Sequence, residues 1–241
     1  MALKQIIPFN YHTFKLEVED AVTSMVTDFR REGTEFWRTT LNQYKYAEYD
    51  YMSGEKVRLE FNEKLHSCSN QDELICVANN ILSWGRMKPL TGTMKEQLTT
   101  SLSYLDSLAS GENMDINKFC VDRLASITKI YEMWDLENWI IYDSFCVKGL
   151  QKLISAFWGS LGYRKYETLL KLPWPPGRSG FQISGFPRVA DTAPRQKRLG
   201  FIYGSWLCRA ISEKLRNNDG YNFYWRPYHI EMIAFNLGHE L

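Results

Sequence analysis

Residues 126–158 constrain the fold of this chain more than any other stretch. They contain an amphipathic helical pattern that stops at a short apolar loop and resumes at an Asp-Ser pair. Its apolar residues recur at the spacing of one helix face: Ile127, Ile130, Tyr131 and Trp134. Residues 135–138 interrupt this periodicity, the apolar run 139–142 follows, and residues 144–158 restart it. Asp143 and Ser144 stand at the restart, where their oxygens can accept the unpaired N–H groups of a first helical turn. The pattern predicts two helices joined by a short loop, with Asp143 at the start of the second.

Helical periodicity extends over most of the chain, and alternating strand patterns are few. A hydrophobic share of 44% is sufficient for a packed interior in a chain of 241 residues. We therefore expect an all-α protein, a compact bundle of about nine to eleven helices. We expect a single domain, 1–241, with two packed lobes: 1–115 together with 196–241, and 116–195. Helices are expected over 18–31, within 36–51, and over 74–84, 94–108, 116–125, 126–134, 144–158, 166–172, 196–215 and 228–237.

Charge and cysteine usage narrow the possible functions. The 29 basic and 28 acidic residues leave a net charge of +1, so only a local cluster of charges could bind nucleic acid. The five cysteines form no Cys-x-x-Cys pair and the four histidines lack metal-ligand spacing, which predicts neither a metal site nor a disulfide framework. No apolar run approaches ~18 residues, no leader-like segment opens the chain, and no glycine-rich phosphate loop is present. We expect a cytoplasmic protein with no cofactor and no membrane partner.

Residues 118–158 resemble the helix-hairpin-helix DNA glycosylases. The resemblance rests on the eight-residue spacing between Asp135 and Asp143. It also rests on two short sequences, Lys-Ile-Tyr at 129–131 and Ile-Tyr-Asp-Ser at 141–144. Both features are similar to the 8-oxoguanine glycosylase branch and to its bacterial relatives, some of which are thought to act in phage defence. In that family a catalytic aspartate stands at the N-terminus of the helix after the hairpin. The resemblance implies this role for Asp143.

The implied activity is excision of a damaged or modified base from DNA, either double-stranded or locally opened, by a monomeric enzyme. Such an enzyme flips the base into an aromatic pocket and hydrolyses its N-glycosidic bond, while a carboxylate stabilises the developing positive charge on the sugar. Some members add a lysine that forms a Schiff base; an ungapped alignment places Leu124 there, and Lys129 fits only with a shift. We therefore expect a monofunctional enzyme that leaves an abasic site. The alternative for Asp143 is a helix cap with no further role.

Other candidate residues divide into two sets. The expected lining of the base pocket is Trp84, Trp139 and Tyr142, for which packing in the core is the alternative. The expected contacts with the DNA backbone are Arg123, Ser126, Thr128, Arg178, Arg188, Arg195, Lys197 and Arg198, several of them in the proline-rich segment 173–195. For these, an ordinary solvated surface is the alternative.

One departure from the family weakens the inference of DNA binding. The hairpin usually contains Leu-Pro-Gly-Val-Gly, whose glycines let backbone N–H groups approach a phosphate. Here residues 120–126, Cys-Val-Asp-Arg-Leu-Ala-Ser, stand in its place. A second hypothesis is therefore a non-catalytic helical scaffold that binds nucleic acid or protein and keeps only a glycosylase-like fold.

Overall fold

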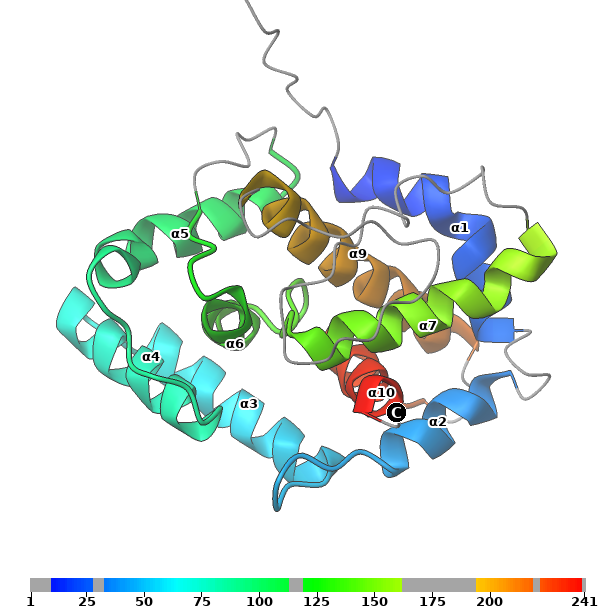
Figure 1. Ribbon diagram of the computed structural model, residues 1–241, viewed down its shortest axis with the longest axis horizontal. Coiled ribbons are helices and arrows are strands. Elements are labelled where there is room, and N and C mark those ends of the chain that lie inside the picture. Colours follow the sequence, from blue (N-terminus) through cyan, green and yellow to red (C-terminus); the bar gives the residue numbers. More distant parts are fainter. Residues whose placement is uncertain (1–9, 28–32, 113–118, 162–193, 219–221, 240–241) are drawn as a thin grey trace, which may run out of the picture.

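The computed structural model describes residues 10–27, 33–112, 119–161, 194–218 and 222–239, and these are mainly helical (Figure 1). Within them the helices are α1 (Tyr11–Thr27), α2 (Thr34–Asn42), α3 (Tyr51–His66), α4 (Gln71–Trp84), α5 (Thr93–Ala109), α6 (Leu124–Trp134), α7 (Ser144–Leu161), α9 (Pro194–Asn218) and α10 (Pro227–His239). The described residues contain no strand, only an isolated bridge between Tyr46 and Tyr49. The expectation of an all-α protein is confirmed.

Local capping explains several helix boundaries. The Asp50 side chain accepts a hydrogen bond from the Ser53 N–H (2.8 Å) at the start of α3. The Asn70 side chain accepts one from the Glu73 N–H (3.0 Å) at the start of α4, and Gly85 ends that helix, as the sequence predicts. Helix α3 itself was not expected, because only Gly54, Arg58 and Leu65 of its residues are buried and no apolar stripe marks it.

The helices pack in two groups (Figure 1). Helix α10 packs most extensively against α7 and also contacts α9 and α2, while α1 lies on α9. Helix α6 packs against α3, α4 and α5. In Figure 1 the α3–α6 group lies on the left and the α7–α10 pair on the right. The division into lobes that we expected from the sequence stays a prediction.

Two glycines allow α7 and α10 to cross at very short range. A Cβ atom on Gly149 of α7 would lie 1.7 Å from the Ala234 carbonyl oxygen of α10. A Cβ atom on Gly238 of α10 would lie 1.9 Å from the Phe145 carbonyl oxygen in the first turn of α7. The backbones therefore touch where other residues would keep them apart, and α10 fixes the start of α7, next to Asp143.

The structure corrects one expected helix. Residues 119–123, part of the helix expected over 116–125, are not helical, and α6 begins at Leu124. Arg123 precedes it in the left-handed conformation, with φ 50°. This part of the expected first arm of the hairpin is wrong. The remainder of that arm, residues 116–118, and the helix expected over 166–172 lie outside the described residues, as do residues 173–193 of the proline-rich segment.

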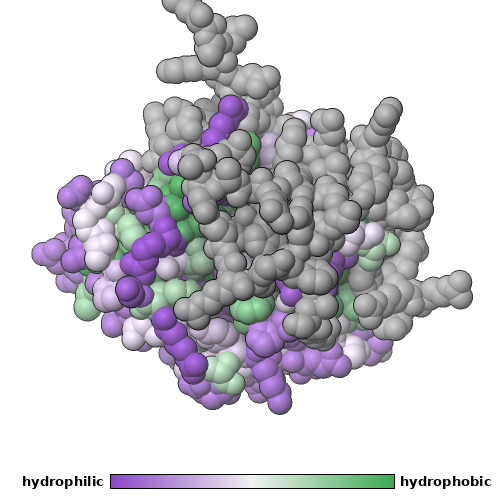
Figure 2. Space-filling model, viewed as in Figure 1, coloured by the Kyte–Doolittle hydropathy of each residue, from purple (hydrophilic) through white to green (hydrophobic). Residues whose placement is uncertain are grey.

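Polar side chains cover most of the described surface on the face shown in Figure 2, with smaller apolar areas between them. Among the described residues, the exposed large apolar side chains are scattered: Leu16, Met52, Leu59 and Tyr224. None of the described helices combines the length and the apolar character needed to cross a membrane.

His229, in the first turn of α10, is fully buried. The Nδ1 atom of His229 accepts a hydrogen bond from the Arg226 N–H (2.9 Å), and its Nε2 atom lies 3.3 Å from Glu55 Oε1. The Tyr228 hydroxyl donates to the same Glu55 oxygen (2.5 Å). Burial lowers the pKa of His229. The nearby His229 imidazole is the main cause that lowers the pKa of Glu55, to about 2.

The lowered pKa of His229 predicts how the free energy of unfolding changes with pH. Its folded pKa lies below the ordinary 6.5, so the unfolded chain binds more protons as the pH falls below 6.5, and His229 then favours unfolding. A His229→Gln variant keeps an acceptor that can reach the Arg226 N–H but does not titrate. We expect the stability advantage of wild type over this variant, measured by urea unfolding, to shrink below pH 6.5 by at most about 1.4 kcal/mol per pH unit. An advantage that stays constant from pH 8 to pH 5 would contradict the assignment.

Candidate functional site

The candidate site centres on Asp143, at the N-terminus of α7. Its Oδ1 atom accepts hydrogen bonds from the N–H groups of Phe145 (3.0 Å) and Cys146 (2.9 Å). Its Oδ2 atom makes no hydrogen bond with any residue that the structure describes. Asp50, the aspartate that caps α3, is exposed, whereas Asp143 is half-buried. Asp143 is thus the expected helix cap, and none of the described residues uses the second oxygen of its carboxylate.

Helix α6 holds the segment that leads to Asp143. The Thr128 hydroxyl accepts a hydrogen bond from the Tyr142 N–H (3.0 Å) and donates one to the Leu124 carbonyl oxygen (2.9 Å). Thr128 is fully buried, and Ser126 nearly so. Both side chains were expected to contact DNA phosphates. The structure places them in the interior instead, and Thr128 there positions the backbone next to Asp143.

A cluster of buried charged side chains joins α3, α6 and α10. Arg58 of α3 forms ion pairs with Glu132 of α6 (3.1 Å) and with Glu231 of α10 (3.0 Å), and all three side chains are almost completely buried. Burial raises the pKa of Glu132 and raises that of Glu231 well above its ordinary value, while the Arg58 charge opposes both shifts. The Asp143 carboxylate also raises the pKa of Glu231, so this cluster and the cap interact electrostatically.

Lys129 belongs to the same cluster. Its side chain is 3% exposed and interacts electrostatically with Glu132 and Glu231. Its Cδ and Cε atoms lie over Gly85, at 2.5 and 2.7 Å from the position that a Cβ atom would occupy there. With Arg58, Glu132 and Glu231 it forms a charge quartet of two cations and two carboxylates, which is formally neutral.

Aromatic rings stand beside the quartet. The Trp84 ring lies 5.6 Å from that of Tyr46 and 6.3 Å from that of Tyr49, centroid to centroid, and the Arg58 guanidinium lies 5.6 Å from the Trp84 ring. Trp84 and both tyrosines are partly exposed. Burial raises the pKa of Tyr46, and the nearby Asp143 carboxylate contributes to that shift. We call Tyr46, Tyr49 and Trp84 the aromatic rim.

The other two expected pocket residues lie elsewhere. Trp139 and Tyr142 are fully buried, and their rings contact Phe201 of α9 at 5.4 and 6.4 Å. They therefore form part of the core, which was the alternative for both. Tyr46 and Tyr49 are not among the pocket residues that the sequence predicts, and the sequence does not single out Arg58, Glu132 or Glu231 either. Nothing in the local pattern around these three residues reveals ion pairs that join helices far apart in the chain.

The expected contacts with the DNA backbone have mixed placements. The Arg123 guanidinium donates to the carbonyl oxygens of Pro89 (2.8 Å) and Lys88, which ties it to the segment after α4. Arg198 donates through Nε to the Phe119 carbonyl oxygen (2.9 Å). Arg195 is exposed and Lys197 half-buried in the first turn of α9. Arg178 and Arg188 lie outside the described residues.

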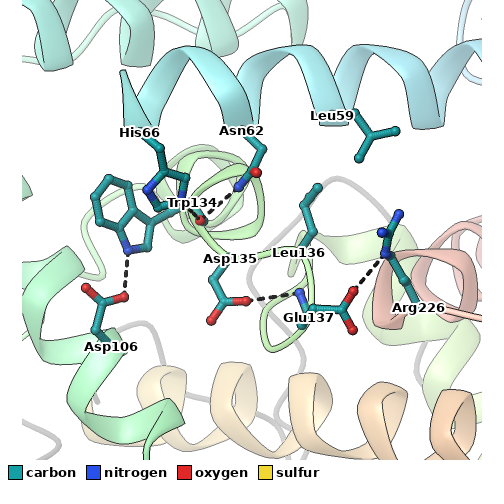
Figure 3. A pocket seen from close by; sticks show the side chains of 9 residues that line it. All are labelled: Leu59, Asn62, His66, Asp106, Trp134, Asp135, Leu136, Glu137 and Arg226. Atoms are coloured by element: carbon teal, nitrogen blue, oxygen red, sulfur yellow. Dashed lines mark hydrogen bonds and ion pairs between the residues drawn. The ribbon is translucent and has the colours of Figure 1, made fainter. Parts of the chain in front are cut away.

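A separate hollow of about 360 Å³ lies beyond the end of α6 (Figure 3). Its lining comprises Leu59, Asn62, His66, Asp106, Trp134, Asp135, Leu136, Glu137 and Arg226. The polar groups are engaged with one another: the Trp134 indole N–H donates to Asp106 (2.7 Å), the Glu137 backbone N–H to Asp135 (3.0 Å) and the Arg226 Nε–H to Glu137 (2.7 Å). Burial raises the pKa of Asp135. These contacts fix the turn that ends α6 and directs the chain towards Asp143.

Within the described ranges, no group of three or more His, Cys, Asp or Glu side chains is arranged to hold a metal ion. Comparison of the chain with protein-family models, with curated proteins and with solved structures finds no match in any of the three.

Proposed function

We propose that the protein is a DNA glycosylase of the helix-hairpin-helix type, which flips out a damaged or modified base and hydrolyses its N-glycosidic bond. The observation that carries this proposal is the half-buried carboxylate of Asp143, with one oxygen held by two backbone N–H groups and the other without a hydrogen bond to any described residue. The partly exposed aromatic rim and the electrostatic interaction of Asp143 with Tyr46 support it.

The proposed reaction uses the two oxygens of Asp143 differently. The N–H groups of Phe145 and Cys146 fix Oδ1, and Oδ2 faces the sugar, where it stabilises the positive charge that develops at C1′. Water adds to C1′ as the glycosidic bond breaks, and the base leaves with the bonding electrons and a proton. The products are the free base and an abasic site. The aromatic rim provides flat faces against which a flipped base can stack.

A specific observation favours the second candidate, a non-catalytic scaffold. The segment 120–126, which replaces the family's glycine-containing hairpin, contains Arg123 in a left-handed conformation, and the Arg123 guanidinium binds two carbonyl groups of the protein. The net charge is only +1. A scaffold that binds protein would show no salt-sensitive retention on DNA, whereas a DNA-binding enzyme is expected to lose affinity steeply as salt rises.

The test is excision of bases from phage genomic DNA with ordinary and with hypermodified bases. Purified protein is incubated with each DNA, and abasic sites are counted with an aldehyde-reactive probe. We expect abasic sites to accumulate on at least one of these DNAs, without strand breaks until alkali is added, as for a monofunctional enzyme. A phage-defence role predicts that the hypermodified DNA reacts. A folded protein that produces no abasic sites on any of them, and shows no salt-sensitive retention, would favour the protein-binding scaffold.

A further inference from the structure

Glu132 and Glu231 offset the charge of Lys129, but its ammonium group lacks a hydrogen-bond acceptor among the described residues. Its side chain is 3% exposed, yet its ammonium group makes no hydrogen bond or ion pair with any residue that the structure describes. A buried donor without an acceptor costs free energy, and such groups occur in native proteins mainly where a ligand or a functional constraint requires them. The Lys129 ammonium therefore points to a missing acceptor.

Trp84 supplies a second unused donor. Trp84 immediately precedes Gly85, over which the Lys129 side chain lies. The Nε1 atom of Trp84 is buried, and no acceptor for it is found among the described residues. The same indole contacts the rings of Tyr46 and Tyr49. The Lys129 ammonium and the Trp84 indole N–H are thus two donors without acceptors among the described residues. The partly exposed rings of the aromatic rim lie in the same region.

The formal charge of the quartet indicates which kind of acceptor can bind these two donors. Arg58 and Lys129 are offset by Glu132 and Glu231, so the cluster carries no formal net charge. A phosphate or another anion would bring an excess negative charge next to two buried carboxylates and Asp143. A neutral oxygen that only accepts hydrogen bonds avoids that repulsion and still satisfies the donors. The chemistry therefore favours a planar, uncharged ring with a carbonyl oxygen.

We propose that Lys129 and Trp84 read the edge of the flipped base and select a ring with a keto oxygen over one with an amino group at the same position. This proposal rests on the proposed function, because it concerns the base that the glycosylase would excise. An amino group is a donor, and placing it against an ammonium and an indole N–H leaves all three donors without acceptors. Gly85 is a positioning residue, since any side chain there would displace Lys129.

The test uses free bases in matched pairs with the full-length protein: hypoxanthine against adenine, and uracil against cytosine. Affinities are measured by NMR titration. We expect the keto member of each pair to bind at least about tenfold more tightly, which corresponds to about 1.4 kcal/mol. In Lys129→Met the preference disappears. In Trp84→Phe, which keeps an aromatic face and removes the N–H, it is reduced.

Gly85→Ala provides a variant that leaves every charge in place. The backbone of Gly85 has φ −73° and ψ 5°, which alanine adopts without strain, but the new methyl group overlaps the Lys129 chain. We expect it to reduce the keto preference, while Ser83→Ala, at an exposed position two residues earlier, leaves it unchanged. This pair also tests the proposal if Lys129→Met does not fold.

Three results would overturn the proposal: equal affinity within both pairs, a keto preference that survives in Lys129→Met or is undiminished in Gly85→Ala, or no binding of any of the four bases to the folded wild type. Failure here is distinct from failure of the proposed function. If the protein produces abasic sites but shows no keto preference, it is a glycosylase whose base is read by other groups. If it binds keto bases but excises none, the site exists without the reaction.

Discussion

Replacement of Gly149 by alanine is expected to lower the free energy of unfolding by about 3 kcal/mol or more, a large part of the ~5–15 kcal/mol that stabilises a typical domain. The added methyl group would lie 1.7 Å from the Ala234 carbonyl oxygen and 2.4 Å from its carbonyl carbon. Both are backbone atoms of α10, so no side-chain rotation relieves the overlap, and the two helices must separate. The α7–α10 pair is the most extensive helix contact of the described fold.

Gly204→Ala is the matched control for this prediction. Gly204 lies in α9, and the atoms nearest to a Cβ atom there belong to side chains, the Tyr142 ring (2.9 Å from Cε2) and Leu150 Cδ1 (3.5 Å). A ring can shift by a few tenths of an ångström, and alanine gains about 1 kcal/mol over glycine in a helix interior. We expect its urea midpoint to stay close to that of wild type, while Gly149→Ala unfolds at much lower urea or is recovered unfolded. Equal midpoints for Gly149→Ala and wild type would show that the helices do not cross as closely as described.

Helix positions were largely predictable, because apolar periodicity and capping residues are local signals. Helices α4 and α5 agree with the ranges expected from their stripes and stop signals. The Asp143–Ser144 restart was predicted as a helix start, and Asp143 does cap α7. The absence of a stripe hid α3, which buries an arginine in place of an apolar face. The expected helix over 116–125 was wrong at 119–123, where a left-handed turn at Arg123 precedes α6.

The surroundings of Asp143 depend on contacts between distant residues and were less predictable. Arg58 and Glu231 are separated by 173 positions in the chain, and no local pattern pairs them. The apolar run that contains Trp139 and Tyr142 fits a pocket and a core equally well in sequence, and only packing against Phe201 distinguishes the two. Trp84 and Lys129 were named for separate reasons, and the sequence does not reveal that the Lys129 side chain lies over Gly85, the residue after Trp84.

The second large effect is expected at Asp143. An asparagine at this position keeps an oxygen that accepts the N–H groups of the first turn, and asparagine ranks with aspartate as an N-cap, so α7 and the stability of the fold are preserved. The substitution removes the negative charge that would stabilise the sugar cation. Loss of one such electrostatic group typically slows the chemical step by about 10²–10³-fold. We expect that loss in the rate of base excision for Asp143→Asn.

Asp50→Asn is the matched control. Asp50 also caps a helix, α3, through a hydrogen bond from a backbone N–H, but it is exposed. The same change of charge and cap chemistry there should leave excision at the wild-type rate. Thermal unfolding of both variants, compared with wild type, establishes that any loss of activity at Asp143 does not arise from loss of the fold.

The decisive measurement is the rate at which abasic sites appear on a DNA that the wild type attacks, for wild type, Asp143→Asn and Asp50→Asn side by side. We expect wild type and Asp50→Asn to excise at the same rate, and Asp143→Asn to be slower by about 10²–10³-fold although it is equally well folded. Excision by Asp143→Asn at the wild-type rate would show that Asp143 is only a helix cap and that the catalytic group lies elsewhere.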